Sequence, residues 1–224
     1  MNTTGLNAQI KRTSLVDAVY ESLLEAIVSG GLAPGAELNS VELAQQLEVS
    51  RTPVKEAIKL LIHDGLVEQV NNHKARVAQF TSQDICEIYE LREQLEGAAV
   101  EKVTQSIDEK VLNQLRSESE LLLQTYGELS WASKAVNYDI RFHTILATES
   151  GNRRLLKEIM RYRLLVRGFC RMTGSEETLL QALKEHIVII EAIESREPLL
   201  ARQAMVSHIQ ARKETVLEQL FTEE

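Results

Sequence analysis

Hydrophobic residues recur at steps of three and four along most of this chain, which is the spacing of helices with one buried face. The first such segment predicts a helix from about Ser14 to Ser29, and Gly30 and Gly31 end it. The predicted buried face of this helix comprises Val16, Val19, Tyr20, Leu23, Leu24 and Ile27. Residues 1–10 carry no periodic pattern and are expected to form a flexible tail.

Two shorter helices and two β-prone segments are predicted between residues 38 and 80. The first helix covers about Ser40 to Leu47, and the second opens at Ser50, a good N-cap residue. Pro53 falls in the first turn of the second helix, where a missing N–H costs nothing. The β-prone segments lie on either side of residues 71–74. This order is typical of a winged helix-turn-helix, which places its second helix in the DNA major groove, and it assigns residues 11–80 to such a domain.

A row of cations lies on the exposed side of the predicted second helix, opposite its buried face. Arg51, Lys55 and Lys59 are spaced four residues apart. A solvated helix face would look the same, but cations at the N-terminal end with short side chains between them favour a recognition helix. A plain polar hairpin is the alternative for the wing tip around Asn72. The predicted DNA contacts are Ser50, Arg51, Thr52, Lys55, Lys59, His73, Lys74 and Arg76.

Composition is compatible with this interpretation. The net charge of the chain is −8, yet residues 50–76 hold five basic residues against three acidic ones, which is enough for phosphate contact. Cys86 and Cys170 lack metal-type spacing, and free buried thiols are favoured over a disulfide. We find no signal peptide and no apolar run of membrane-spanning length, so a cytoplasmic location with no membrane partner is expected.

The second half of the chain, residues 81–224, is predicted to be entirely helical. Thr81 and Asp84 have the spacing of a capping box and start the first helix. Short linkers separate the later segments, which is typical of an antiparallel bundle. The fold class is therefore mainly α, with a winged helix-turn-helix followed by a bundle of about six helices. These are predicted at 82–104, 108–126, 131–149, 152–173, 176–195 and 198–220.

Four polar residues fall on the apolar faces of these predicted helices. Asp139 and His143 are four residues apart and share one face, and His186 and His208 lie on the inward stripes of the last two helices. A carboxylate inside a bundle needs a partner or a metal. Imidazoles with a carboxylate suit zinc, nickel, manganese or iron. Taken singly, each histidine is also compatible with a core or interface role.

Several short motifs of the first domain are familiar together: Leu32-Ala33-Pro34-Gly35, Leu43-Ala44, Val49 through Ala57, Asp64-Gly65-Leu66-Val67 and Ala75-Arg76-Val77. With these motifs the domain resembles the DNA-binding domain of GntR-family bacterial transcription regulators. Three positions depart from the usual pattern of that family: Val41 stands where some members have an Arg, Glu48 where Gly is usual and Lys55 where Arg is common. The operator sequence therefore cannot be transferred.

The second domain also carries a set of recognisable stretches: residues 91–96, Asp139 through His143, Ser150-Gly151-Asn152, Glu185-His186 and Met205 through Ile209. With these stretches it resembles the effector domain of the FadR-like branch of this family, called FCD, and its six predicted helices are closer to the VanR-like subgroup. The resemblance implies a divalent transition metal, zinc first, held by Asp139, His143, His186 and His208.

A metal held in this way leaves coordination positions open to a small carboxylate effector. Arg92, Arg163 and Arg167, with Arg171 in the same row, are candidates for a second anchor of that acid. Solvated charges or salt bridges of a dimer are the alternative for these arginines.

Together these features predict a transcription regulator and not an enzyme. The resemblance implies a homodimer, whose two recognition helices would read a pseudo-palindromic double-stranded operator. An effector acid would control operator affinity, and repression relieved by the acid is favoured over activation. Two alternatives remain at this point. One is a metal-dependent enzyme acting on a small organic acid through the Asp/His cluster, although no motif provides a general base. The other is a structural adaptor that dimerises through its helices.

Overall fold

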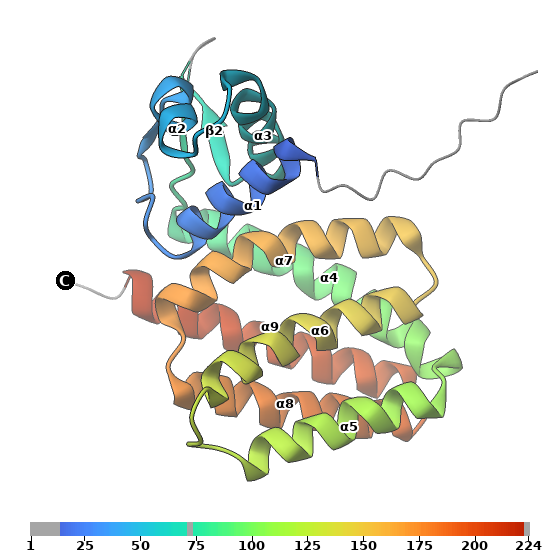
Figure 1. Cartoon of the computed structure of the whole chain (residues 1–224). Coiled ribbons are helices and arrows are strands. Elements are labelled where there is room, and N and C mark those ends of the chain that lie inside the picture. Colours follow the sequence, from blue (N-terminus) through green and yellow to red (C-terminus); the bar gives the residue numbers. More distant parts are fainter. Residues whose placement is uncertain (1–13, 71–73, 222–224) are drawn as a thin grey trace, which may run out of the picture. The chain divides into compact units, whose positions relative to one another are not determined.

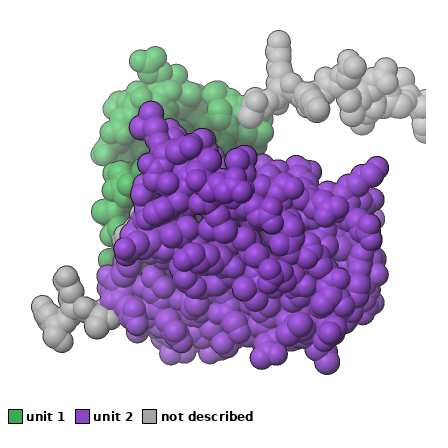
Figure 2. Space-filling model, turned by 90° about the horizontal axis from the view of Figure 1, so that it is seen from below, with its two compact units in different colours: residues 1–79 green, residues 80–224 purple. Residues whose placement is uncertain are grey.

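The computed structural model describes residues 14–70 and 74–221. The chain divides into two compact units, residues 1–79 and 80–224, which Figure 2 shows in different colours. The predicted tail and the predicted wing-tip residues Asn72 and His73 lie outside the described residues. Within the described ranges there are nine helices and three short strands, which confirms the mainly α fold class.

The first unit begins with α1 (Leu15–Val28), whose N-terminus is fixed by a capping box between Ser14 and Asp17. It continues with β1 (Glu37–Leu38), α2 (Ser40–Gln46), α3 (Arg51–Asp64), β2 (Val67–Gln69) and β3 (Ala75–Val77). Gly65 ends α3 with φ 83°, a conformation that glycine adopts without steric cost. Apart from the short strand β1, which was not predicted, this is the order of elements expected for a winged helix-turn-helix.

The core of this unit is the interface of α1 and α3. The apolar stripe predicted to be the buried face of α3 is buried, and it comprises Val54, Ala57, Ile58 and Leu61. On α1 the prediction was partly wrong: Val16, Tyr20 and Ile27 are only half-buried, and Val28 is buried instead. Tyr20 stays at the edge of the core, where its hydroxyl donates to Asp64 Oδ2 over 2.7 Å. The remaining buried residues of α1 are Val19, Leu23 and Leu24.

Two residues in the turn between α2 and α3, Glu48 and Ser50, do not behave as their residue types predict. Glu48, where the resembled family has glycine, has φ 53° in the left-handed region that disfavours residues with a Cβ. Ser50 occupies the N-cap position of α3 with extended backbone, but its side chain makes no capping hydrogen bond. The Ser50 hydroxyl is therefore not used to cap the helix.

The second unit is a bundle of six helices within the described residues (Figure 1). Thr81 and Asp84 form the predicted capping box. Helix α9 packs along both α4 and α8, and α6 packs against α4, α7 and α8. In the described part of the chain, we find no helix with the length and apolar character needed to span a bilayer. The six helices are α4 (Ser82–Ser106), α5 (Glu109–Gln124), α6 (Trp131–Glu149), α7 (Arg153–Thr173), α8 (Glu176–Glu194) and α9 (Pro198–Phe221).

Candidate functional site

The N-terminal end of α3 presents exposed cations. Arg51, Thr52 and Lys55 are exposed, and α3 has no acidic residue in its first turn. Neither Arg51 nor Lys55 forms an ion pair with another described residue. The free N–H groups of the first helical turn add positive partial charge at the same end. This end of α3 is therefore suited to contact phosphates and base edges.

Lys59 differs from the two cations before it on the same helix. Its Nζ lies 2.7 Å from Glu56 Oε1, one turn back, and both side chains are largely exposed. An exposed pair of this kind contributes little to stability, so it does not prevent Lys59 from reaching DNA. It does neutralise part of the charge, and we expect Lys59 to contribute less to DNA affinity than Arg51.

The wing carries carboxylates beside its predicted DNA-contacting cations. The three strands form an antiparallel sheet in the order β1-β3-β2, in which Arg76 lies opposite both Glu37 and Glu68. Arg76 Nη2 lies 3.3 Å from Glu68 Oε2, and Lys74 Nζ lies 3.0 Å from Glu37 Oε2. Contact of Arg76 or Lys74 with phosphate must therefore compete with an ion pair inside the wing.

Replacing Glu68 by glutamine is expected to raise DNA affinity about two- to fivefold, because it releases Arg76 from a half-exposed ion pair and removes a negative charge near the phosphates. Fluorescence anisotropy with a labelled operator at fixed salt measures this. Glu21→Gln removes the same charge from an exposed position on α1 and serves as the matched control. Unchanged or weaker binding by the Glu68 variant would place Arg76 away from the DNA.

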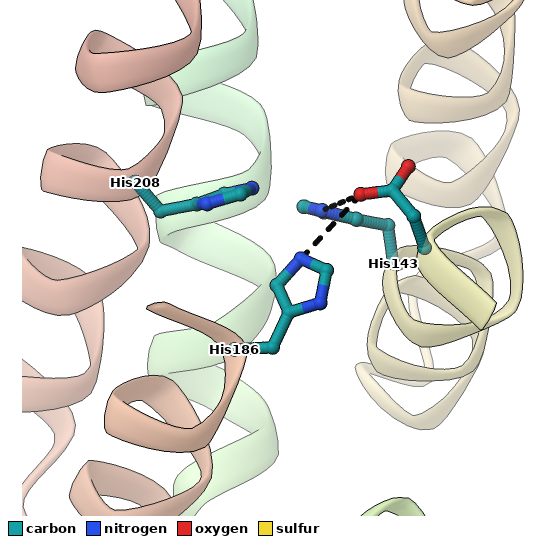
Figure 3. A group of neighbouring side chains, drawn as sticks. His143, His186 and His208 are labelled. Carbon is teal, nitrogen blue, oxygen red and sulfur yellow. Dashed lines mark ion pairs between the residues drawn. The ribbon is translucent and has the colours of Figure 1, made fainter. Parts of the chain in front are cut away.

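Four side chains that are distant in the sequence meet inside the second unit. Asp139 and His143 come from α6, His186 from α8 and His208 from α9. One ligand atom from each, an imidazole nitrogen or a carboxylate oxygen, lies within 4.8 Å of the others. Figure 3 shows the imidazoles of His143, His186 and His208 pointing toward one another, with dashed lines from His143 and His186 to the neighbouring carboxylate. All three histidines are at most 2% exposed.

Two of these histidines are held by carboxylates behind them. His143 Nδ1 contacts Glu96 Oε2, and His208 Nδ1 lies 2.8 Å from Glu185 Oε2. A carboxylate that accepts from Nδ1–H leaves Nε2 as the ligand atom and increases its basicity, an arrangement typical of metal-binding histidines. His186 is held differently, by stacking on Phe142 with ring centroids 4.1 Å apart.

The protonation states also suit a metal. Burial lowers the pKa of His143, His186 and His208 below the ordinary histidine value, so the three imidazoles are neutral near neutral pH. For Asp139, burial by itself would raise the pKa, but the net effect of its surroundings, led by the guanidinium of Arg163, lowers it. Three neutral imidazoles and one carboxylate form the donor set of zinc and related divalent ions.

Buried polar atoms without a hydrogen-bond partner test whether these four residues fit a metal ion. His143 Nε2 and both ring nitrogens of His186 are buried and have none. The Nε2 atoms of His143 and His186 lie 3.7 and 3.5 Å from Asp139 Oδ1, too far for hydrogen bonds. Unpartnered buried nitrogens are costly, and a metal between them and Asp139 would remove that cost. These residues therefore fit a divalent transition metal.

A cavity of about 60 Å³ adjoins the cluster, and Asp139 and His208 form part of its wall. Of the three predicted effector anchors, Arg92 and Arg163 line this cavity, whereas Arg167 is not among the described residues that do. The side chain of Arg171 lies outside the described residues, as does that of Cys170. Cys86 is a free, half-buried thiol.

Three residues of the site were missed by the sequence reasoning. Glu96 and Glu185 hold the histidines, and Arg212 lines the cavity beside His208. Each had a local signal: Glu96 lies four residues after Arg92, Glu185 directly precedes His186, and Arg212 lies one helical turn after His208. A charged residue that is adjacent to a predicted site residue, or one helical turn from it, is therefore a local signal for a supporting role.

A winged helix-turn-helix unit joined to a helical bundle with a buried Asp/His cluster defines a class, the DNA-binding regulators with a separate sensing domain. Residues 15–77 match the model of the bacterial regulatory proteins of the gntR family, and residues 87–211 match the FCD domain. The chain belongs to the GntR family of transcriptional regulators and carries an FCD domain, as its sequence motifs indicated.

Curated relatives agree with this assignment. The chain is 31% identical to the uncharacterized HTH-type transcriptional regulator YdhC of Bacillus subtilis, over 84% of this chain and 85% of that protein. It is 31% identical to the HTH-type transcriptional regulator LutR of the same species, over 88% of this chain and 98% of that protein. It is 28% identical to a probable D-xylose utilization operon transcriptional repressor of Paenarthrobacter nicotinovorans, over 91% of this chain and 89% of that protein.

Solved structures agree on the fold. E. coli McbR/YncC matches with a TM-score of 0.74 at 22% identity, covering 93% of this chain and 99% of that chain. A putative GntR transcriptional regulator from Rhodococcus sp. RHA1 matches with a TM-score of 0.71 at 25% identity, covering 92% of this chain and 98% of that chain. The family matches and the curated relatives, rather than these structures, make the protein a DNA-binding transcriptional regulator and not an enzyme. The metal-dependent enzyme considered from the sequence was therefore the wrong alternative.

Proposed function

We propose that this protein is a metal-containing, acid-responsive repressor. Asp139, His143, His186 and His208 would hold one divalent transition ion, with zinc the first candidate and nickel, manganese or iron the others. The observation that carries the proposal is the buried cluster itself, in which carboxylates hold His143 and His208 and nitrogens of His143 and His186 lack partners. Bound there, the ion would supply open coordination positions for a carboxylate.

The protein's own residues would bind and orient the acid. Arg92 and Arg163 line the adjoining cavity and are at most half-exposed, so the acid would be largely shielded from water. Shielding strengthens the attraction between guanidinium and carboxylate. Arg167 stays a weaker candidate, because it is not among the described residues of this wall.

The acid would control DNA binding by a population shift. A ligand changes operator affinity only through its differential affinity for the two states of the protein, one competent to bind the operator and one not. Repression relieved by the acid is proposed because a relative in this family is named a probable repressor of an operon. A direct test measures affinity for the protein's own promoter DNA with and without small carboxylic acids. Identical affinities for every acid tested would refute acid control.

DNA binding would use the predicted residues of α3 and the wing. Arg51 and Lys55, exposed and unpaired among the described residues, would reach base edges or phosphates, and Ser50, Thr52 and Lys59 would contact phosphates. Lys74, Arg76 and His73 would contact the backbone or the minor groove from the wing. Because its target is chromosomal DNA, the protein is proposed to act in the cytoplasm.

A homodimer is proposed because a pseudo-palindromic operator requires two α3 helices. In the second unit, Leu91 on α4 and Met160 on α7 are exposed apolar residues. Each lies one turn from a partly buried leucine, Leu95 or Leu156, of one shared apolar cluster. We assign the surface that contains Leu91 on α4 and Met160 on α7 to the contact with the partner copy. The six helices of the unit support the VanR-like subgroup.

Replacing Met160 by glutamate is expected to convert the dimer to a monomer at micromolar concentration, because the dimer would bury an unpaired charge. Light scattering coupled to size-exclusion chromatography gives the mass. Leu199→Glu, at a more exposed apolar position on α9, is the matched control and should leave the dimer unchanged. A dimeric Met160 variant would move the interface elsewhere.

A further inference from the structure

The arginines of the cavity are joined to the proposed metal ligands. Arg163 Nη2 lies 2.5 Å from Asp139 Oδ2, which leaves Oδ1 facing the histidines. Arg92 Nε donates to Glu96 Oε1 over 2.9 Å, and the second oxygen of Glu96 contacts His143. Two of the ligands are therefore supported by an arginine that also lines the cavity.

Arg212 supports a third ligand from the other side of the cavity. Its Nη2 lies 3.5 Å from Glu185 Oε1, and the second oxygen of Glu185 contacts His208 Nδ1. Its Nη1 donates to the carbonyl oxygen of Thr178 over 2.9 Å. Its Nε is buried and has no hydrogen-bond partner. These contacts engage only part of the five N–H donors of the guanidinium, so Arg212 can also donate to a ligand in the cavity that it lines.

The charges of this wall are balanced before any metal is added. Among the described residues of the wall and the network behind it, the arginines Arg92, Arg163 and Arg212 are matched by the carboxylates Asp139, Glu96 and Glu185. Imidazoles that bind a metal are neutral and add no charge. A divalent ion would thus leave two positive charges without compensation in a largely buried region, which is unfavourable.

We infer that the effector is a short dicarboxylic acid, with one carboxylate near Asp139 and His208 and the second on Arg212. Two negative charges restore the balance that the metal disturbs, and the second carboxylate accepts from the guanidinium of Arg212, which lines the cavity. The volume open to the centre of a water molecule is only about 60 Å³, which favours a small ligand. The wall between the charged groups is largely apolar and fits a hydrocarbon spacer: Val136, Val166, Leu179, Ala182 and Val216.

This inference rests on the proposed function, and one experiment separates the two. Isothermal titration calorimetry of the zinc-loaded full-length protein compares the dicarboxylates from malonate to adipate with their monomethyl esters. Each ester keeps the chain length and removes one charge. At least one dicarboxylate is expected to bind about tenfold or more tightly than its ester, because a charged hydrogen bond in a buried site is lost.

Arg212→Gln shows whether the second carboxylate lies on Arg212. The variant is expected to weaken the preferred dicarboxylate about tenfold or more and its ester about twofold or less, because the lost donor faces only the second carboxylate. Zinc content of the variant, measured by elemental analysis, must stay at the wild-type value, since Arg212 also supports Glu185. Lys213→Gln removes a cation from the neighbouring position, which pairs with Glu93 instead, and is the matched control.

The outcomes are distinguishable. If a monomethyl ester binds as tightly as its diacid, or if Arg212→Gln weakens both equally, the dicarboxylate inference is overturned and the acid-responsive function stands. If no acid in the series binds the zinc-loaded protein, the proposed acid effector fails and this inference fails with it.

Discussion

Replacing Arg51 by alanine is expected to weaken operator binding by about 100-fold or more while the fold and the dimer stay intact. Arg51 is the first residue of α3, is exposed, and forms no ion pair within the described residues. Each good base contact by such a residue contributes about 1–3 kcal/mol of discrimination, and a homodimer would lose two of them. Fluorescence anisotropy with the protein's own promoter DNA measures the affinity.

Lys59→Ala is the matched comparison for this experiment. Lys59 lies two turns further along the same helix and is paired with Glu56, so its loss should weaken binding much less. Circular dichroism and size-exclusion chromatography verify that both variants keep their fold and mass. Wild-type affinity of the Arg51 variant would mean that α3 does not enter the groove through its N-terminal end.

The double variant His143→Ala, His186→Ala is expected to lose bound metal and the response of operator affinity to acid. His143 and His186 supply two of the four proposed ligands, and removing two leaves too few donors for tight binding of a transition ion. DNA affinity without acid should stay within a few-fold of wild type, because α3 and the wing are unchanged. Anisotropy titrations with and without acid measure both quantities.

Two further variants make this prediction specific. Asp139→Asn changes only one oxygen of the cluster, so it tests the same site with less risk to packing. His63→Ala removes an exposed histidine from α3, outside the cluster, and should leave metal content unchanged. An acid response that survives in the double variant would place the effector away from this cavity.

Much of the fold was predictable because its signals are local. Hydrophobic spacing located the six helices of the second unit with ends within two residues of the observed ones. Capping residues and glycines mark element ends through short-range hydrogen bonds and sterics, and Thr81 and Gly65 are examples. The prediction of the buried face of α1 was less accurate. Tyr20 lies at the edge of the core because its hydroxyl donates to Asp64, and this contact joins residues 44 positions apart.

The site was predictable only in part because its four proposed metal ligands come from three different helices. The pairing of Asp139 with His143 follows from helical spacing, but their meeting with His186 and His208 depends on how α6, α8 and α9 pack. Arg92 and Arg163 were predicted as candidates and line the cavity, whereas Arg167, four residues after Arg163, is not among the described residues that do. The role of Arg212 required knowing that α9 faces Glu185 on α8.

The most direct test of the central claim is the metal content of the purified protein beside that of the His143→Ala, His186→Ala variant. Elemental analysis should find about one transition-metal ion per wild-type chain and essentially none in the variant, as expected for a single site with four protein ligands. Wild-type protein that contains no metal and takes up none from added zinc, nickel, manganese or iron would contradict the claim, as would a variant that retains a full equivalent.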